Sequence, residues 1–588
     1  MTPFDYAVLV FYFVFMVAIS WIFRRFVTNV SDYFRGGGKA LWWMVGGSAF
    51  MVQFSAWTFT GAASKAYSDG WPIAVIYLGN VVGFTLSAIH FAPRYRQLRV
   101  VTGMEAIRQR FGRVSEQFFT WLQLPFGLLQ AGIWLNSLAV FFAAVFSIDL
   151  TLTIVLTGLV VLVMALIGGS WAVLASDFIQ VVILMPVCLV VTVLAVIKIG
   201  GPASFIAQAP AHHLDLGQVF STDFLGLWCV AMILKQIHTT NNLGDANRYL
   251  CVKDGSHARR AGFLGAGLFL GGILIWFIPP MIAAIRFPDL GAMFPHLRNP
   301  EEAAFIAIAR DVMPVGMMGL LVSGIFAATM SSMDSGLNKN TGFFIKNFYQ
   351  PVLRPQATDG QLLTVGKITT AVFGLMIIFV ALGMSQLKGL TLFQLTQRLS
   401  ILIGIPIIVP LFLGLLIKRT PPWSAWSTVV VGFLSSLFIT RYLTPEWAAE
   451  FFGRGRALDA TSAEYWRQSA ELLGNVAICS LWFIGTKFFW SRASADTHAR
   501  VAEFFHRLNT PVDFNREEGA GAANDDRQSR VVGWLCVAYG AFIALLAIIP
   551  NPLGGRLAFV GCGAVVLAIG WALVAASRKG AAATTPAA

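Results

Sequence analysis

About fifteen long apolar stretches run along the chain, and they limit its fold more than any other feature. Each is close to the ~20 residues that a helix needs to cross a bilayer. Because backbone polar groups cannot stay unpaired in lipid, we expect an all-α polytopic membrane protein with about 15 transmembrane helices. The stretches lie roughly at 3–23, 41–66, 71–93, 115–146, 149–168, 170–199, 222–240, 260–285, 314–338, 364–385, 390–417, 422–442, 471–490, 532–550 and 555–577.

Composition supports this class: 57% of the 588 residues are hydrophobic, 12% are charged, and the mean hydropathy is +0.70. Soluble domains carry about twice that charged fraction. The net charge of +13 is concentrated in alternate loops, which argues against a nucleic-acid partner and matches the positive-inside pattern. We therefore expect a multi-pass plasma-membrane protein, as in a bacterial inner membrane, with the N-terminus outside and the C-terminus cytoplasmic. The basic loop residues are Arg24, Arg25, Arg35, Lys39, Arg94, Arg96, Arg99, Arg108, Arg110, Arg113, Arg248, Lys253, Arg259, Arg260, Lys418, Arg419, Arg578 and Lys579.

Motifs of soluble chemistry are missing from the sequence. The six cysteines are scattered with no CxxC, which argues against disulfides and thiolate metal sites. The chain has no HExxH, GxSxG or P-loop, so we expect neither an enzyme nor an ATP-driven pump. The expected partners are the lipid bilayer and small solutes, with no obligate protein partner evident.

Polar residues interrupt the apolar stretch at 314–338, where residues 320–340 read LLVSGIFAATMSSMDSGLNKN. Polar groups at membrane depth are costly unless they meet a partner, an ion or water. Ala328, Ser331 and Ser332 are spaced i, i+3 and i+4, so they share one helix face. Two hydroxyls and a free carbonyl are the hard oxygen ligands that hard cations prefer. This face therefore suggests a cation site.

The second stretch is a candidate for a broken helix, because residues 46–64 read GGSAFMVQFSAWTFTGAAS. Dense glycine and β-branched residues weaken a helix, and unwinding would free carbonyls that can bind a cation. The alternative is a small-residue face for helix packing. Together with the Ala328, Ser331 and Ser332 face, ion binding is the favoured interpretation.

Five segments resemble the sodium:solute symporter family, over roughly residues 3–420. They are SDYFRGGGKALWWMVGGSAF, GGSWAVLASDFIQ, NRYLCVKDGSHARRA, AATMSSMDS and LTQRLSILIGIPIIVPLFLGLLIKRT. The resemblance implies a LeuT-type 5+5 inverted-repeat core that works by alternating access, with one N-terminal and about four C-terminal extra helices. The expected divisions are 1–40, a core at 41–420 built from 41–200 and 222–420, and 421–588 with a cytoplasmic linker at about 491–531.

The resemblance also implies a sodium site. The family's ligands map onto the carbonyls of Met51, Phe54 and Ala328 and the hydroxyls of Ser331 and Ser332. Asp177 corresponds to an aspartate near which sodium leaves, although a helix-end charge paired with arginine is the alternative. Asp334 could attract sodium, carry a coupled proton, or pair with a cytoplasmic Lys or Arg.

Candidate solute-binding residues follow from the same resemblance. Sugar-transporting members carry a glutamate near the place where this chain has Tyr77 or Leu78, and a gating tyrosine near the place where it has Gly244. The lack of both residues in this chain argues against hexose as the solute. Lys235, His238 and Arg398 are cationic groups near or within spans and could meet a carboxylate, so an organic acid or amino acid is the expected solute, unless these charges only snorkel at helix ends. The candidates are Gln53, Trp57, Thr58, Lys235, His238, Asn242, Gln397 and Arg398.

The sequence thus predicts a sodium-coupled secondary active symporter, with Na+ as the coupled ion. Two alternatives remain: a proton-coupled symporter that uses Asp177 or Asp334, or a transporter-like membrane sensor with little transport. The absence of a signalling domain in the sequence argues against the sensor.

Overall fold

The computed structural model describes residues 1–23, 38–167, 170–295, 297–387, 389–453, 456–518 and 525–583. These residues form helices and connecting turns, with one isolated bridge between Ala40 and Val252. The basic residues Arg24, Arg25 and Arg35 lie outside the described residues. So do the linker segment 519–524 and the tail 584–588.

Twelve described helices are long and apolar enough to cross a membrane. Their length follows from apolar runs that contain few charges, as the sequence predicts. They comprise α1 (Pro3–Phe23), α5 (Ala74–Leu86) with its flanking turns, α8 (Arg113–Phe146), α10 (Ser170–Lys198), α15 (Gly255–Arg286), α18 (Met317–Phe343), α19 (Asp359–Ser385), α20 (Leu392–Leu399) joined to α21 (Ile405–Leu416), α22 (Ser424–Tyr442), α24 (Ala460–Gly485), α27 (Asp525–Leu545) and α28 (Leu553–Ala583).

The other three predicted spans are also helical, but they are shorter or interrupted. The stretch at 149–168 forms α9 (Leu150–Ile167), and the stretch at 222–240 forms α14 (Leu225–Thr240). The stretch at 41–66 is divided into α3 (Trp42–Val52) and α4 (Gly61–Ser68). The all-α polytopic fold expected from the sequence is therefore confirmed.

Residues 53–60 separate α3 from α4, and local hydrogen bonds hold this break open. The Ser55 hydroxyl accepts the amide of Trp57, and the Thr60 hydroxyl donates to the carbonyl of Ala56 at 3.0 Å. A short 3-10 turn spans Ala56–Phe59. Carbonyls that a continuous helix would pair internally are therefore available to other partners.

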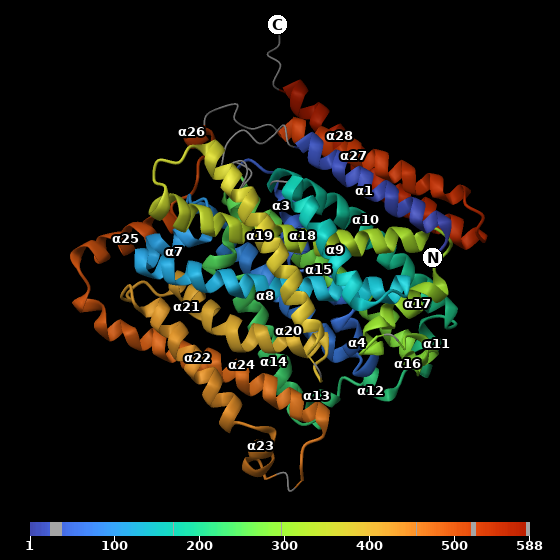
Figure 1. The fold of residues 1–588 in the computed structure, drawn as a ribbon, viewed down its shortest axis with the longest axis horizontal. Coiled ribbons are helices and arrows are strands. Elements are labelled where there is room, and N and C mark those ends of the chain that lie inside the picture. Colours follow the sequence, from blue (N-terminus) through green and yellow to red (C-terminus); the bar gives the residue numbers. More distant parts are fainter. Residues whose placement is uncertain are drawn as a thin grey trace.

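Helix α18 lies at the centre of the bundle (Figure 1). Its most apolar 18-residue stretch is completely buried. Helix α10 packs against both α3 and α18, α15 packs against α3, α4 and α5, and α8 packs against α18 and α19. The break between α3 and α4 is therefore enclosed by helices on several sides, with α18 crossing it.

The remaining helices flank this core. Figure 1 shows α1 beside the paired α27 and α28 along one edge, with α22 and α24 at another. A Cβ atom added to Gly533 of α27 would lie only 2.9 Å from the carbonyl oxygen of Gly570 in α28. Glycine therefore permits the close approach of these two helices.

Short helices of mixed charge gather at one end of the bundle. Helices α7 (Gly103–Phe111), α25 (Ala495–Asn509) and α26 (Phe514–Glu518) lie there, whereas α11 (Pro202–Gln208), α16 (Leu290–Met293) and α23 (Pro445–Phe451) lie toward the opposite end (Figure 1). The buried Arg110 of α7 donates to the carbonyls of Gly414, Ile417 and Lys418, and so caps α21. A cation at a helix C-terminus is favoured by the helix dipole.

Candidate functional site

The hydroxyl of Ser332 in α18 points into the break between α3 and α4. Its Oγ lies 3.1 Å from the carbonyl oxygen of Met51, 3.0 Å from that of Phe54 and 3.3 Å from that of Ala328. One hydroxyl proton can be donated fully to only one of these three oxygens. The site is therefore rich in buried acceptors and poor in donors, and we call these four groups the serine–carbonyl cluster.

Ser331 lies beside this cluster on α18. Its hydroxyl is buried near the carboxyl of Asp177, and among the described residues it makes no hydrogen bond of good geometry. A buried polar atom without a well-formed hydrogen bond is uncommon and often marks a water or ion position. The five oxygens predicted as sodium ligands thus come from two elements that meet at the helix break. Whether they bind sodium stays a prediction.

A second contact holds α18 against the break. The Thr329 hydroxyl accepts the amide of Ala56 at 2.8 Å and also bonds the carbonyl of Ile325 within its own helix. The sequence shows polar residues within the apolar segment 320–340, but no sequence pattern identifies Thr329 as the partner of Ala56. This bond fixes the first residue of the 3-10 turn relative to α18.

Asp177 of α10 is fully buried within a polar cluster rather than hydrated at a helix end. One carboxylate oxygen accepts the hydroxyl of Ser48 and lies 3.8 Å from Arg248. Asp334 of α18 is also buried near Arg248, and its Oδ1 has no hydrogen-bond partner among the described residues. Two carboxylates therefore share one arginine. Ser48 is the member that sequence reasoning missed, because many hydroxyls occur in the 46–64 segment.

Lys235 of α14 donates a hydrogen bond to the side-chain oxygen of Gln397 in α20. Only 6% of Lys235 and 1% of Gln397 is exposed, so the ammonium is removed from water. Within the described part of the chain, Lys235 forms no ion pair with a carboxylate. An isolated buried charge is costly, and a carboxylate ligand would offset that cost.

The helix break brings further predicted residues toward this pair. The ring of Trp57 stacks on Phe393, which lies one turn before Gln397 on α20. Thr58 is buried, and its hydroxyl lies 2.7 Å from the hydroxyl of Tyr77. Tyr77, which lies near the position of the glutamate in sugar-transporting members, is therefore hydrogen-bonded to Thr58, a predicted solute residue. Gln53, in contrast, is exposed within the break.

Three other predicted solute residues contact their own surroundings instead. His238 bonds the carbonyl of Leu234 at 2.9 Å, one turn earlier on α14. Asn242 accepts the amide of Gly244 and donates to Thr239, so it caps the end of α14. Arg398 has Glu471 of α24 as a charged neighbour. These contacts resemble structural roles more than solute contacts.

Comparison with known proteins concerns the sequence family and the fold of this chain. The family model described as the sodium:solute symporter family matches residues 33–432. Sodium/myo-inositol cotransporter 2 of Mus musculus is 27% identical over 481 residues, which cover 74% of this chain and 70% of that protein. Sodium/glucose cotransporter 1 of Ovis aries is 25% identical over 520 residues, which cover 78% of this chain and 74% of that protein.

Among solved structures, the substrate-bound outward-open state of a Na+-coupled sialic acid symporter has a TM-score of 0.67 and 20% identity. The match covers 84% of this chain and 98% of that chain. At this identity the likeness concerns the fold alone. It confirms the LeuT-type arrangement that the sequence resemblance implied.

Proposed function

Because this chain belongs to the sodium:solute symporter family, we propose that it imports a small organic acid or amino acid together with sodium by alternating access. Sodium-coupled symport is the activity that this membership supports. The nature of the solute, the ion ligands and the direction of transport are our inferences.

The serine–carbonyl cluster carries the proposal. In it, three carbonyl oxygens lie within 3.3 Å of a single hydroxyl at a helix break. Sodium bound there would contact the carbonyls of Met51, Phe54 and Ala328 and the hydroxyls of Ser331 and Ser332. Neutral oxygen dipoles suffice for a small hard cation, and the ion would relieve the surplus of acceptors. Sodium would then strengthen the contact between the break and α18, which Thr329 and Ser332 already make.

Lys235 favours an anionic solute. Its ammonium is buried against Gln397 and has no carboxylate partner among the described residues. The side chains of Trp57 and Phe393 connect this pair to the break, so ion and solute would act on the same two elements. The relatives named above transport myo-inositol and glucose, and a polyol is therefore the competing solute class.

The proposed cycle follows from this connection. External sodium orders the break and favours the state that accepts solute, and by linkage the solute strengthens sodium binding by the same factor. The core then changes its access, and sodium leaves toward the cytoplasm past Asp177. A membrane potential contributes ~2.3 kcal/mol per charge per 100 mV, which can drive accumulation. The basic loops would face the cytoplasm, with the N-terminus outside.

The test is the thermal stability of the purified protein with carboxylates, amino acids, sugars and polyols, each in sodium and in potassium. A ligand that binds the folded state raises its apparent stability. Stabilisation by a carboxylate or amino acid only in sodium supports the proposal. Stabilisation by a polyol alone would refute the anionic solute, and stabilisation independent of sodium would refute sodium coupling.

A proton-coupled symporter is the second candidate, because Asp334 is buried near Asp177 with an oxygen that has no partner among the described residues. Two carboxylates at one arginine favour holding a proton at one of them. Uptake driven by a pH gradient in potassium, and lost in Asp334→Asn, would support this alternative.

A further inference from the structure

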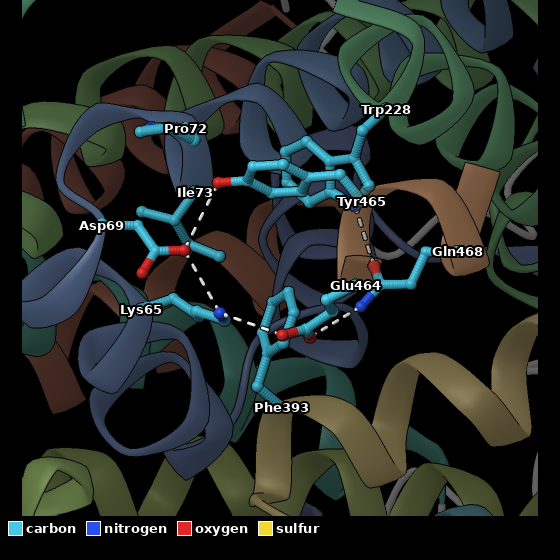
Figure 2. A pocket seen from close by; sticks show the side chains of 9 residues that line it. All are labelled: Lys65, Asp69, Pro72, Ile73, Trp228, Phe393, Glu464, Tyr465 and Gln468. Atoms are coloured by element: carbon cyan, nitrogen blue, oxygen red, sulfur yellow. Dashed lines mark hydrogen bonds and ion pairs between the residues drawn. The ribbon is translucent and has the colours of Figure 1, made fainter. Parts of the chain in front are cut away.

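Helix α24 carries a polar stripe that faces the transport core, although it lies beyond the 33–432 region matched by the family model. Glu464, Tyr465 and Gln468 are spaced i, i+1 and i+4, so they lie on one face of this helix. Figure 2 shows the three side chains converging on Lys65, Asp69, Trp228 and Phe393 around a small pocket. Their partners come from three core helices.

The first partner is α4, the second half of the broken helix. The Nζ of Lys65 lies 3.3 Å from Glu464 and 3.1 Å from Asp69, and the hydroxyl of Tyr465 donates to Asp69 at 3.3 Å (Figure 2). The side chains of Lys65, Asp69 and Glu464 are only 15–20% exposed. Ion pairs at such partly buried positions are less screened than surface pairs.

The other partners are α14 and α20. The indole of Trp228 donates to Gln468 at 2.8 Å, and Gln468 in turn donates to Glu464 at 2.9 Å. The amide of Gln394 donates to Glu464 at 3.4 Å. Glu464 therefore accepts bonds from groups on α4 and α20, and through Gln468 it is connected to α14.

This network closes the region directly beside the proposed solute site. Phe393 lines the pocket, stacks on Trp57, and lies one turn before Gln397. Lys65 lies 5.5 Å from the centre of the Phe393 ring. Lys235 and Gln397 lie further along α14 and α20 than Trp228 and Phe393, and the stripe joins these two helices to α4.

We propose that Glu464, Tyr465 and Gln468 of α24 form an outer latch that stabilises the state closed to the outside. The inference rests on the proposed alternating access and on the predicted orientation, in which this end faces outward. Glu464 is a positioning residue: it does not touch the solute, but it holds Lys65 and Gln394 in the closed arrangement. Opening requires the Lys65–Glu464 pair to separate.

The experiment measures access to a cysteine beneath the latch and needs neither solute nor sodium. Thr58→Cys places a thiol at a buried position, and a membrane-impermeant thiol reagent is added to intact cells that express it. We expect Glu464→Gln to raise the labelling rate of this cysteine about fivefold, because a partly buried ion pair is lost from the closed state alone. The same chain without Thr58→Cys gives the background from native cysteines.

Glu450→Gln is the matched control, since Glu450 is exposed on neighbouring α23 and makes the same change of charge. Trp228→Phe is the second latch variant, which removes the bond to Gln468 without changing charge and should also speed labelling. The latch is refuted if neither latch variant labels faster than Glu450→Gln. Because labelling is measured without solute or sodium, faster labelling in the latch variants upholds the latch whatever the stability test above shows for sodium coupling. The two proposals therefore fail separately.

Discussion

The hydroxyl of Ser332 lies 3.0 Å from the carbonyl oxygen of Phe54, although 278 positions separate the two residues in the chain. The contact joins central helix α18 to the break in the second predicted span. Because a helix break is held by few local bonds, anything that binds between these groups stabilises the pairing of the two elements. The contact is therefore the point at which the proposed ion would influence conformation.

Replacing both hydroxyls tests the proposed ion ligands. In Ser331→Ala with Ser332→Ala, we expect the sodium concentration for half-maximal uptake to rise at least ~10-fold, which is about 1.4 kcal/mol of lost binding. The measurement is uptake against sodium concentration in proteoliposomes. Ser323→Ala is the control, because Ser323 is buried on the same helix but bonds only the carbonyl of Gly319 among the described residues. Unchanged sodium dependence in the double variant would exclude these ligands.

A substitution at Gln397 can neutralise the charge of Lys235 while the lysine itself stays in place. In Gln397→Glu, the new carboxylate would pair with the Lys235 ammonium and occupy the position proposed for an anionic solute. We expect solute affinity to fall at least ~10-fold while stability without solute is kept. Lys235→Met should produce a similar loss. Calorimetric titration measures both, and wild-type affinity in Gln397→Glu would show that the solute does not meet Lys235.

Arg110 is predicted to stabilise the fold without taking part in transport. Replacing it with methionine leaves the carbonyls at the end of α21 without their buried donor and should destabilise the protein by about 2–4 kcal/mol. Thermal unfolding in detergent measures the change. Arg507→Ala is the control, since Arg507 and its partner Glu503 are 44% and 53% exposed and surface pairs contribute little. Equal stability of the two variants would contradict the capping role.

Glu302 predicts a specific pH dependence of stability. It lies in the connection between α16 and α17 (Ala304–Val312), and burial raises the pKa of its carboxyl to about 7 even though it accepts the amide of Leu392 at 2.9 Å. The folded state then binds more protons than the unfolded state between about pH 4.5 and 7. This carboxyl therefore makes stability fall as pH rises through that window, and the fall levels off above it.

Glu302→Gln should remove this contribution and raise stability at pH 8 by about 2–3 kcal/mol, because the amide oxygen still accepts the bond from Leu392. Melting temperatures from pH 5 to 8 provide the measurement. Glu301→Gln, on the neighbouring and exposed residue, is the control. A pH profile in Glu302→Gln that matches the wild type would refute this account.

The helices and the polar face of α18 could be predicted because they depend on local pattern. Apolar runs of membrane length and the i, i+3, i+4 spacing of Ala328, Ser331 and Ser332 are visible in the sequence itself. The sequence also predicts the shorter helix α14 as a span at 222–240, although Lys235 and His238 lower its hydropathy. The interruption at 53–60 followed from clustered glycine and hydroxyl residues.

The pairings within the site could not be predicted in the same way. Lys235 and Gln397 are 162 positions apart, and Asp177 and Ser48 are 129 positions apart. Such contacts depend on how helices pack, and no period in a single sequence records them. For the same reason the sequence does not reveal Glu471 of α24 as a charged neighbour of Arg398, whose role toward the solute stays a prediction. The polar stripe of α24 was missed for the same reason.

Three of the five oxygens proposed to bind sodium belong to the main chain, at Met51, Phe54 and Ala328. A point mutation can change the side chain at these positions but cannot delete the ligand atom. Loss of a proposed ion ligand by a single substitution is therefore confined to Ser331 and Ser332, or to changes that reshape the break. A site of this kind would tolerate side-chain substitutions at most of its own residues, because its ion specificity would depend mainly on the conformation of the main chain.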